Sequence, residues 1–352
     1  MNDAGTSFYE KKYTSEELLS EQNRILDKYK TEMREIIQKL KVSSNPRIFI
    51  IKPTPYDQNA KLSKSAAVGK NQTLQKIGVS VDELAKEVGA TVVDFYNPLN
   101  ELNLNGQKSD SAFTIIGKDR VHPGPVGHLL MAYLFLKTQQ VPEIVSKVEI
   151  NANGKINVTN AILSNFKKEK HDVSFELKEN SLPFPIAKEA ESALKYMSVN
   201  NLNNELLNLK GFESGTYKLM IDDIEIGTYT SQELITGINL ALNSKTPQYK
   251  QAQAVLKLLT SAASKRTKLR DMLMAKIMMD KAKIDINDSI QLKTYTLDKK
   301  KQNPYYEMVI NAYIQNKDKV TDIEAEIEND LTESRKLSFP QKHRFELIEI
   351  LN

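Results

Sequence analysis

The chain has 352 residues, of which 40% are hydrophobic and 27% are charged, and its formal net charge is +4. This balance is ordinary for a folded protein and gives no strong attraction to nucleic acid or to an anionic membrane. The 352 residues include no cysteine, which excludes thiol catalysis, disulfide bonds and Cys-ligated zinc and leaves the redox compartment open.

Three further features of composition limit the function. No stretch approaches the roughly 20 apolar residues that are needed to span a bilayer. Residues 2–12 are polar, so no signal peptide opens the sequence. The lysine runs at 167–170 and 299–301 are short, and the first contains Glu169, which is more typical of solvated surface than of a nucleic-acid stripe. We therefore expect no transmembrane segment and no nucleic-acid partner.

The first part of the sequence alternates between helical and strand patterns. Thr14 and Glu17 have the spacing of a capping box at the start of a long amphipathic helix, and Gly89 is placed to end a second helix. The predicted order is helix, strand, helix, strand, helix, over residues 14–40, 47–51, 71–88, 91–95 and 127–136. Both strands are apolar enough to be buried on two faces, which favours a parallel sheet. Asp94 falls at the carboxyl end of the second strand, where α/β sheets place functional groups.

This order predicts an α/β fold with part of a doubly wound, flavodoxin-like sheet. Two parallel strands do not make a stable sheet, because each needs neighbours to satisfy its backbone and to bury both faces. We therefore expect upstream strands that this sequence does not contain.

The middle of the sequence reads as a small antiparallel sheet or sandwich. Short strand patterns occur at 145–150, 155–158 and 173–177, and Asn153-Gly154 is a turn signal. Residues 216–221 and 224–229 flank Asp222-Asp223 and predict a tight hairpin.

The last part of the sequence is mainly helical. Thr230 with Glu233 forms a capping box before a helix over 234–242, and Thr246 with Pro247 starts a long helix that reaches about Met279. Shorter helices are expected over 304–313 and 320–331. The methionines of the long helix fit core filling better than an adaptable binding surface; they are Met272, Met274, Met278 and Met279. The acidic stretch 322–330 fits a solvated face better than a metal site. We predict three regions: an α/β domain over 1–142, a β-rich accessory domain over 143–230 and a helical C-terminal region over 231–352.

The segment Asp119-Arg120-Val121-His122-Pro123-Gly124 contains the minimum pair for orienting a catalytic imidazole. The histidine takes a proton, and an aspartate three residues earlier holds the other ring nitrogen in the right tautomer. A lone histidine near a helix start is usually structural. Asp119 and the Pro-Gly that follows His122 favour catalysis here.

This segment resembles the last motif block of the SGNH (GDSL-type) hydrolases, Asp-x-x-His followed by Pro. The opening Asn2-Asp3 resembles the Gly-x-Asn-Asp block of that family, with Met1 at the x position, and the elements between the two blocks follow in the order that the family uses. The resemblance covers roughly residues 1–140. It implies that His122 is the general base, that Asp119 orients it and that the Asn2 amide helps to bind the oxyanion.

The sequence departs from the family at the nucleophile. The Gly-Asp-Ser block, which supplies the serine of the Ser-His-Asp triad, and the glycine block of the oxyanion hole are absent. Ser109-Asp110-Ser111 echoes the motif without a preceding buried strand, and Ser7 lacks a strand-to-helix elbow. We therefore expect an N-terminally truncated hydrolase that begins inside the third block.

The resemblance implies a serine esterase of the lipase-like type, which needs no metal or organic cofactor. Its substrate would be a small-molecule or carbohydrate ester, or a lipid. The alternative is a catalytically silent binding or scaffold protein with a hydrolase remnant. Relatives of this build are often exported, so the parent protein is expected in the periplasm or outside the cell. The oligomeric state stays open.

The other candidate residues have weaker signals. Arg120 is suited either to binding substrate or to pairing at the surface, and Asp3 either to capping a turn or to the chemistry. His128 fits packing or helix capping, because a His-x5-His metal pair lacks further ligands. His171 and His343 stand in polar surroundings and give no signal.

Overall fold

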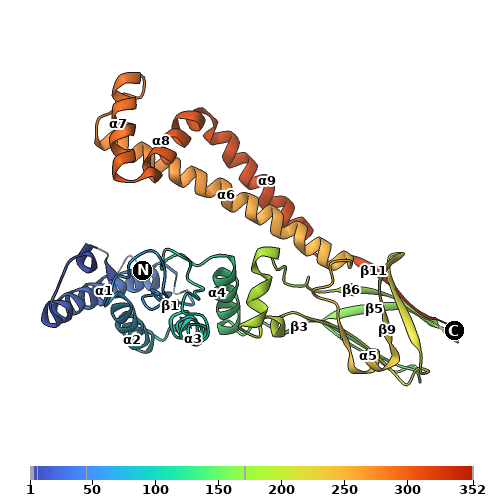
Figure 1. Cartoon of the computed structure of the whole chain (residues 1–352). Helices are drawn as coiled ribbons and strands as arrows, with labels where there is room; N and C mark the ends of the chain where they lie inside the picture. Colours follow the sequence, from blue (N-terminus) through green and yellow to red (C-terminus); the bar gives the residue numbers. More distant parts are fainter. Residues whose placement is uncertain (1–3, 6, 45, 170–171, 351–352) are drawn as a thin grey trace. The chain divides into compact units, whose positions relative to one another are not determined.

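The computed structural model describes residues 4–5, 7–44, 46–169 and 172–350. Its contacts divide the chain into two compact units. The first unit comprises Met1–Glu143 with Ile186–Asn203, and the second comprises Ile144–Pro185 with Asn204–Asn352. Figure 1 follows both units along the sequence, from blue at the N-terminus to red at the C-terminus.

Helices surround a parallel pair of strands in the first unit. β1 (Phe49–Lys52) and β2 (Thr91–Asp94) pair in register, with Phe49 opposite Thr91 and Lys52 opposite Asp94. The helices of this unit are α1 (Ser15–Ser44), α2 (Lys70–Val88), α3 (Tyr96–Gly106) and α4 (Pro125–Thr138). Its 3-10 turns are η2 (Ser7–Glu10), η3 (Lys188–Lys195) and η4 (Val199–Leu202). The predicted α/β class and parallel strand pairing are confirmed.

Local signals set several element ends in the first unit. The Thr14 amide donates to the Glu17 carboxylate, and the Glu17 amide donates to the Thr14 hydroxyl, which is the predicted capping box. Gly89 ends α2 in the left-handed conformation, with φ of 70°. α3 was not predicted. It starts where Asp94 accepts hydrogen bonds from both the amide and the side chain of Asn97.

The core of the first unit lies where α1 and α2 pack together and α2 contacts the strands. One apolar cluster combines Ile37 of α1, Ile50 of β1 and Leu84 of α2, all buried. A second joins Tyr56, Leu74 and Tyr96 near the ends of the strands. Burial of such side chains contributes roughly 1.5–3 kcal/mol each.

One prediction about the first strand is wrong. β1 was expected to be buried on both faces, but Ile51 is 44% exposed. Phe135 on the apolar helix α4 is also partly exposed. The reason is that β1 pairs only with β2 among the described residues, and α4 contacts this face of β1 at Phe49, whose ring lies 6.3 Å from that of Phe135.

The second unit is a β-sandwich with a helical extension. One sheet has the strand order β10-β7-β3-β4 and the other has the order β5-β6-β11-β8-β9. The strands are β3 (Ile144–Asn151), β4 (Ile156–Thr159), β5 (Ala161–Lys168), β6 (Asp172–Glu179), β7 (Asn204–Lys210), β8 (Thr216–Ile221), β9 (Ile224–Thr230), β10 (Ile238–Asn239) and β11 (Lys342–Glu349).

The inner faces of both sheets form one apolar core. Leu207 and Leu209 from β7 meet Leu219 from β8, and the rings of Phe175 and Phe345 stack with centroids 5.1 Å apart. The predicted hairpin of β8 and β9 is confirmed. Asp222 and Asp223 adopt positive φ angles of 48° and 65° at its turn.

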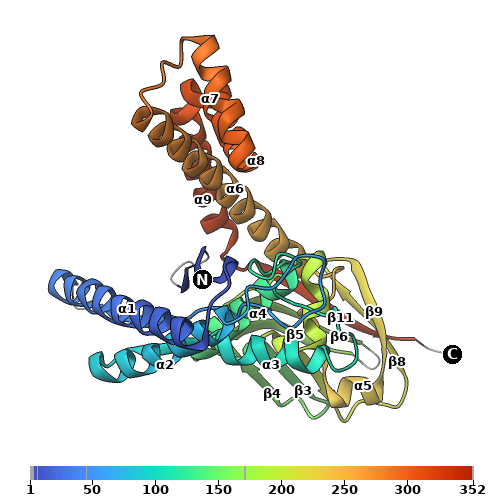
Figure 2. The same cartoon turned by 60° about the vertical axis from the view of Figure 1, so that its left-hand side comes forward.

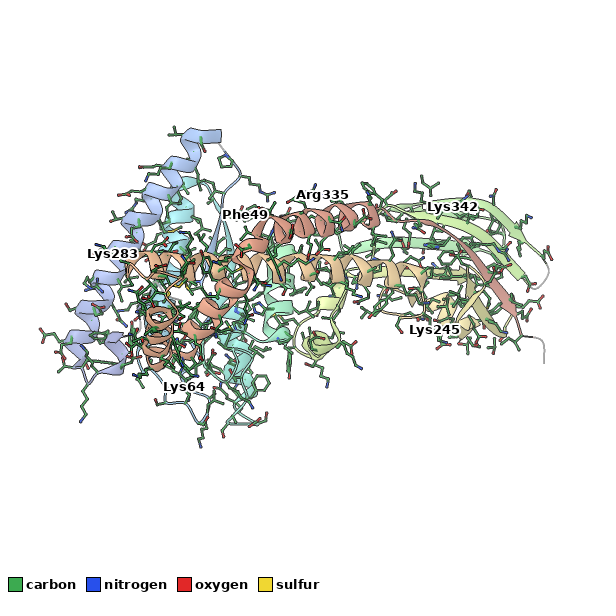
Figure 3. All side chains as sticks on the ribbon, turned by 90° about the horizontal axis from the view of Figure 1, so that it is seen from above. Phe49, Lys64, Lys245, Lys283, Arg335 and Lys342 are labelled. Atoms are coloured by element: carbon green, nitrogen blue, oxygen red, sulfur yellow. The ribbon has the colours of Figure 1, made fainter. Side chains whose placement is uncertain are left out.

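Apart from the short helix at Ser231–Thr236, which packs against β7 and β9, the helices of the second unit extend away from the sandwich (Figure 2). They are α5 (Ser231–Thr236), α6 (Pro247–Lys281), α7 (Ser289–Gln302), α8 (Pro304–Asn316) and α9 (Val320–Leu337), with the turn η5 (Lys317–Lys319). α6 packs along α9 and α8. Figure 3 labels Lys245 and Lys283 at opposite ends of α6, and Lys342 where β11 begins after α9. We call α6 to α9 the helical hairpin.

The helical predictions hold in part. Thr246 caps α6, and the Thr230–Glu233 capping box is present. The helix predicted over 234–242 stops at Thr236, because Gly237 has φ of 103° and the chain then enters β10. α7 was not predicted. Met272 and Met279 are buried among other apolar side chains, which confirms core filling for these two.

The compact units divide the chain differently from the predicted ranges 143–230 and 231–352. β11, at residues 342–349, lies in the middle of the five-stranded sheet, between β6 and β8. The helical hairpin is therefore an insertion between strands of one sandwich in this unit. Residues 186–203, from within the predicted β-rich range, pack with the first unit instead.

Candidate active site

The Asp119–His122 loop is built around two glycines that cannot be replaced easily. Gly117 has φ of 82°, and a Cβ there would lie 2.4 Å from the backbone oxygen of His122. A Cβ on Gly127 would lie 2.7 Å from the backbone oxygen of Ile115. Because only glycine fits both positions, the loop turns tightly just before α4, where Pro125 occupies the first turn.

Within this loop Asp119 and His122 are in direct contact. The Nδ1 atom of His122 lies 2.6 Å from Oδ2 of Asp119, and the other carboxylate oxygen accepts the amides of Val121 and His122 at 2.9 Å. Among the described residues, only Nδ1 of the His122 ring takes part in a hydrogen bond. The imidazole is 82% exposed, so Nε2 is open to a reactant.

The electrostatics of this contact favour an ionised carboxylate. Partial burial tends to raise the pKa of Asp119, but the amide of His122, its ring and the amide of Val121 outweigh that effect. Together they lower the pKa of Asp119 to about 2. A carboxylate that keeps its charge at neutral pH can stabilise an imidazolium beside it.

Arg120 does neither of the things that its sequence position suggested. Its side chain is 3% exposed and donates to backbone carbonyl oxygens of Asp57, Ala60 and Lys64, at distances from 2.6 to 2.9 Å. The Asp57 amide in turn donates to the Arg120 carbonyl. Arg120 therefore fixes the segment 57–64, which follows β1, against the loop that carries His122.

The structure describes the remaining candidates unevenly. Asn2 and Asp3, predicted at the oxyanion site, lie outside the described residues, as does His171. His128 is exposed on α4. His343 stands in polar surroundings in the sequence and carries no signal there. In the structure it is 7% exposed, with Nδ1 2.5 Å from Oδ2 of Asp222, because β11 carries it between β6 and β8.

The serines that were considered as nucleophiles stand in other contacts. The Ser109 hydroxyl donates to the carbonyl of Gly106 at the end of α3, and the Ser111 carbonyl accepts the amide of Lys61. Among the described residues, no serine hydroxyl makes a hydrogen bond with His122.

Asp94, at the end of β2, also has a structural set of partners. It accepts the Lys52 ammonium at 3.2 Å as well as the Asn97 side chain. Asp82 binds the same ammonium at 2.8 Å. Burial tends to lower the pKa of Lys52, but these two carboxylates outweigh burial and raise it. Lys52 thus ties α2 to the strand ends, a role that its place in an apolar run did not indicate.

The comparisons agree with the predicted family. Residues 1–135 match the family described as GDSL-like Lipase/Acylhydrolase. A gut microbial diltiazem-metabolizing enzyme of known structure is 28% identical. The alignment covers 99% of this chain and 82% of that enzyme, with a TM-score of 0.85. The comparison with curated proteins gives no match.

The fold, the Asp-x-x-His loop and these matches define the class. Residues 1–135 resemble the GDSL-like lipase/acylhydrolases, and by this family resemblance the chain is an ester hydrolase. Within the described ranges no helix is long and apolar enough to cross a membrane, and no group of three or more His, Asp or Glu side chains is placed to hold a metal ion.

Proposed function

We propose that the chain carries the acid–base part of a serine esterase, with His122 as general base and Asp119 as its orienting partner. The observation that carries the proposal is the 2.6 Å contact between Asp119 and Nδ1 of an imidazole whose Nε2 faces solvent. We further propose that the nucleophilic serine lies in sequence outside these 352 residues.

In this mechanism the serine hydroxyl attacks the ester carbonyl while Nε2 of His122 takes its proton. The imidazolium then gives that proton to the departing alcohol, which leaves an acyl-enzyme. Water, deprotonated by the same nitrogen, releases the acid and restores the serine. Asp119 stays ionised throughout and stabilises the imidazolium, and the Asn2 amide is assigned to the oxyanion.

The exposed apolar surface of the first unit supports the proposal that the nucleophilic serine belongs to another segment of the protein. A two-stranded parallel sheet rarely stands alone, and strands of this composition are normally covered on both faces. Here Ile51 of β1 and Phe135 of α4 are partly exposed. The structural neighbour has 18% of its chain outside the alignment, since 82% is covered, which leaves room there for further elements.

For the substrate we propose a small acyl ester. The enzyme that the chain resembles is described as diltiazem-metabolizing, and diltiazem contains an acetyl ester. An acetyl ester has a small acyl group, so an enzyme that hydrolyses it needs only a small site for that group. Acylated carbohydrates and lipid esters are the other substrates that the family resemblance implies.

The test begins with the DNA upstream of the first codon. An in-frame segment that encodes a strand followed by Gly-Asp-Ser is the expected result. The chain of 352 residues and the extended chain are then assayed with p-nitrophenyl acetate and diltiazem. We expect hydrolysis by the extended chain alone.

Three variants of the extended chain locate the base. We expect His122→Ala and Asp119→Asn to lose about 10⁴-fold in kcat, as removal of triad members does elsewhere. His128→Ala is the matched control and should retain activity, because His128 is an exposed histidine six residues along. Hydrolysis that survives His122→Ala would place the site elsewhere. An upstream stop codon together with no activity would favour the silent binding protein.

A further inference from the structure

Two glutamates that take no part in the proposed hydrolysis are buried in the second unit. Glu179, at the end of β6, and Glu205, in β7, are 1% and 2% exposed. Both line an internal cavity with about 10 Å³ of space, enough for about one water molecule. Except for Ser146, the other lining residues are apolar: Val148, Phe175, Leu177, Leu206, Leu207, Leu240 and Phe345.

Few hydrogen bonds compensate this burial. The Ser146 hydroxyl donates to one oxygen of Glu179 at 2.6 Å. The second oxygen of Glu179 and both carboxyl oxygens of Glu205 have no hydrogen-bond partner. The buried side-chain amide of Gln248 also has no partner at hydrogen-bond distance, but it lies near enough to Glu179 to lower the pKa of that carboxyl. A carboxylate ion without partners in an apolar cavity is very unfavourable, and a second one beside it is more so.

The surroundings distinguish the two carboxyl groups. Burial raises the pKa of Glu205 well above its ordinary value, and the neighbouring charge of Glu179 raises it further. Burial also raises the pKa of Glu179, but Ser146, Gln248 and the charge of His343 act against that rise. Glu179 is therefore the better place for a negative charge, and Glu205 is the better place for a proton.

The elements around the pair contribute few other charges. β11 contributes His343, and the turn between β8 and β9 contributes Asp222, whose carboxylate binds His343. From β3 comes Ser146, and from the first turn of α6 comes Gln248. No lysine or arginine is among the described residues that line the cavity.

We propose that Glu179 and Glu205 share one proton and form a pH-sensitive latch at the root of the helical hairpin. Gln248 belongs to the first turn of α6, and His343 follows α9 by six residues. Across this root Gln251 donates from its side chain to the carbonyls of Leu337 and Phe339 at 2.7 and 2.8 Å. The start and the end of the hairpin therefore both border the pair.

Loss of the shared proton places a second negative charge in the apolar cavity. The cavity can relieve it only by admitting water or by separating the two carboxyl groups. Separation moves β6 or β7 and disturbs the hydrogen bonds that hold α6 against the end of α9. The root is therefore closed while the pair holds its proton, and it loosens as the pH rises.

The direction of the pH effect follows from proton linkage. The folded chain holds a proton that the unfolded chain releases near the ordinary glutamate pKa of about 4.3. Since the folded value is higher, this proton stabilises the fold fully below about pH 4. The stability is then lost as the pH rises. One proton changes the unfolding equilibrium constant by up to tenfold per pH unit.

The test uses the whole chain and measures amide hydrogen exchange at the root between pH 5 and pH 9. The measured rates are corrected for the intrinsic exchange rate at each pH. In the wild type we expect residues 246–252 and 337–343 to lose protection as the pH rises, by up to tenfold per unit. Glu205→Gln keeps the shape and removes the titration, so its protection should stay constant. Glu328→Gln, an exposed glutamate of α9, is the matched control and should behave like the wild type.

A second measurement does not depend on the variant folding well. The infrared spectrum of the wild type at pH 7 should contain the carbonyl stretch of a protonated carboxylic acid, which disappears at alkaline pH. Absence of that band, or equal pH dependence in the wild type and Glu205→Gln, would overturn the latch. The latch would also be overturned if Na⁺ or Ca²⁺, but not choline, stabilised the wild type saturably and failed to stabilise Glu205→Gln. That result would make the pair a cation site.

Discussion

Replacement of Arg120 tests whether the loop that carries His122 depends on the segment 57–64. In Arg120→Ala the guanidinium no longer reaches the carbonyl oxygens of Asp57, Ala60 and Lys64. Lys64 is exposed, so water replaces the bonds to its carbonyl at little cost. Asp57 and Ala60 are buried, and their carbonyls lose a charged donor in a place that water does not reach easily.

The magnitude follows from these two buried bonds. A hydrogen bond to a charged group contributes about 1.5–3 kcal/mol, so the loss of two costs about 3–6 kcal/mol in the stability of the first unit. Arg120 also has a φ of 69°, which glycine adopts with less strain. Arg120→Gly should therefore be less destabilising than Arg120→Ala by about 1 kcal/mol. Arg120→Lys should recover part of the loss, since an ammonium can reach one or two of the carbonyls.

Hydrogen exchange measures this effect where it is expected. In Arg120→Ala the amides of residues 57–64 and of residues 117–122 should exchange faster by at least a hundredfold, since each 1.4 kcal/mol is tenfold. Lys61→Ala, an exposed residue of the same segment, should change the stability by less than about 0.5 kcal/mol. An Arg120→Ala protein with wild-type protection in both segments would refute the reasoning.

Three further predictions concern the loop and the sandwich. Gly117→Ala should lower the free energy of unfolding by at least about 2 kcal/mol, because its Cβ would lie 2.4 Å from a backbone oxygen and its φ is 82°. Gly124→Ala, whose Cβ would have nothing within 4 Å, should be nearly neutral in the same thermal unfolding measurement. Carbon NMR should show the Asp119 carboxyl titrating near pH 2. Its contribution to stability is about 1 kcal/mol after allowance for its 44% exposure, and it should disappear as the pH falls through that value. A titration midpoint above about pH 3.5 would contradict this prediction. Phe175→Ala should destabilise the second unit by about 3–5 kcal/mol in urea unfolding, whereas the exposed Phe339→Ala should cost less than about 0.5 kcal/mol.

The elements that the sequence predicted well are those with local signals. The capping boxes at Thr14 and Thr230, the glycine that ends α2 and the hairpin turn at Asp222 each depend on residues within four positions of one another. Where the sequence failed, distant partners decided the structure. The helix predicted over 234–242 is cut short by β10, which pairs with β7 about thirty residues earlier.

The candidate site divides in the same way. The contact of Asp119 with His122 spans three residues and is expected from their spacing alone. The role of Arg120 could not be predicted from the sequence, because its hydrogen-bond partners lie 56 to 63 positions away. No pattern in the sequence distinguishes a surface arginine from one that donates to three backbone carbonyls in a folded loop.

By itself the sequence determined the family resemblance, the α/β class of the first region and the contact of His122 with Asp119, because these depend on motif spacing and on geometry between residues that are close in the sequence. Only the tertiary structure decided that β11 completes a sheet begun about 180 residues earlier, and that Glu179, Glu205 and His343 meet in one interior. The physical reason is that burial belongs to the packed chain. A glutamate in a strand pattern has an ordinary charge until two sheets close over it and remove its water.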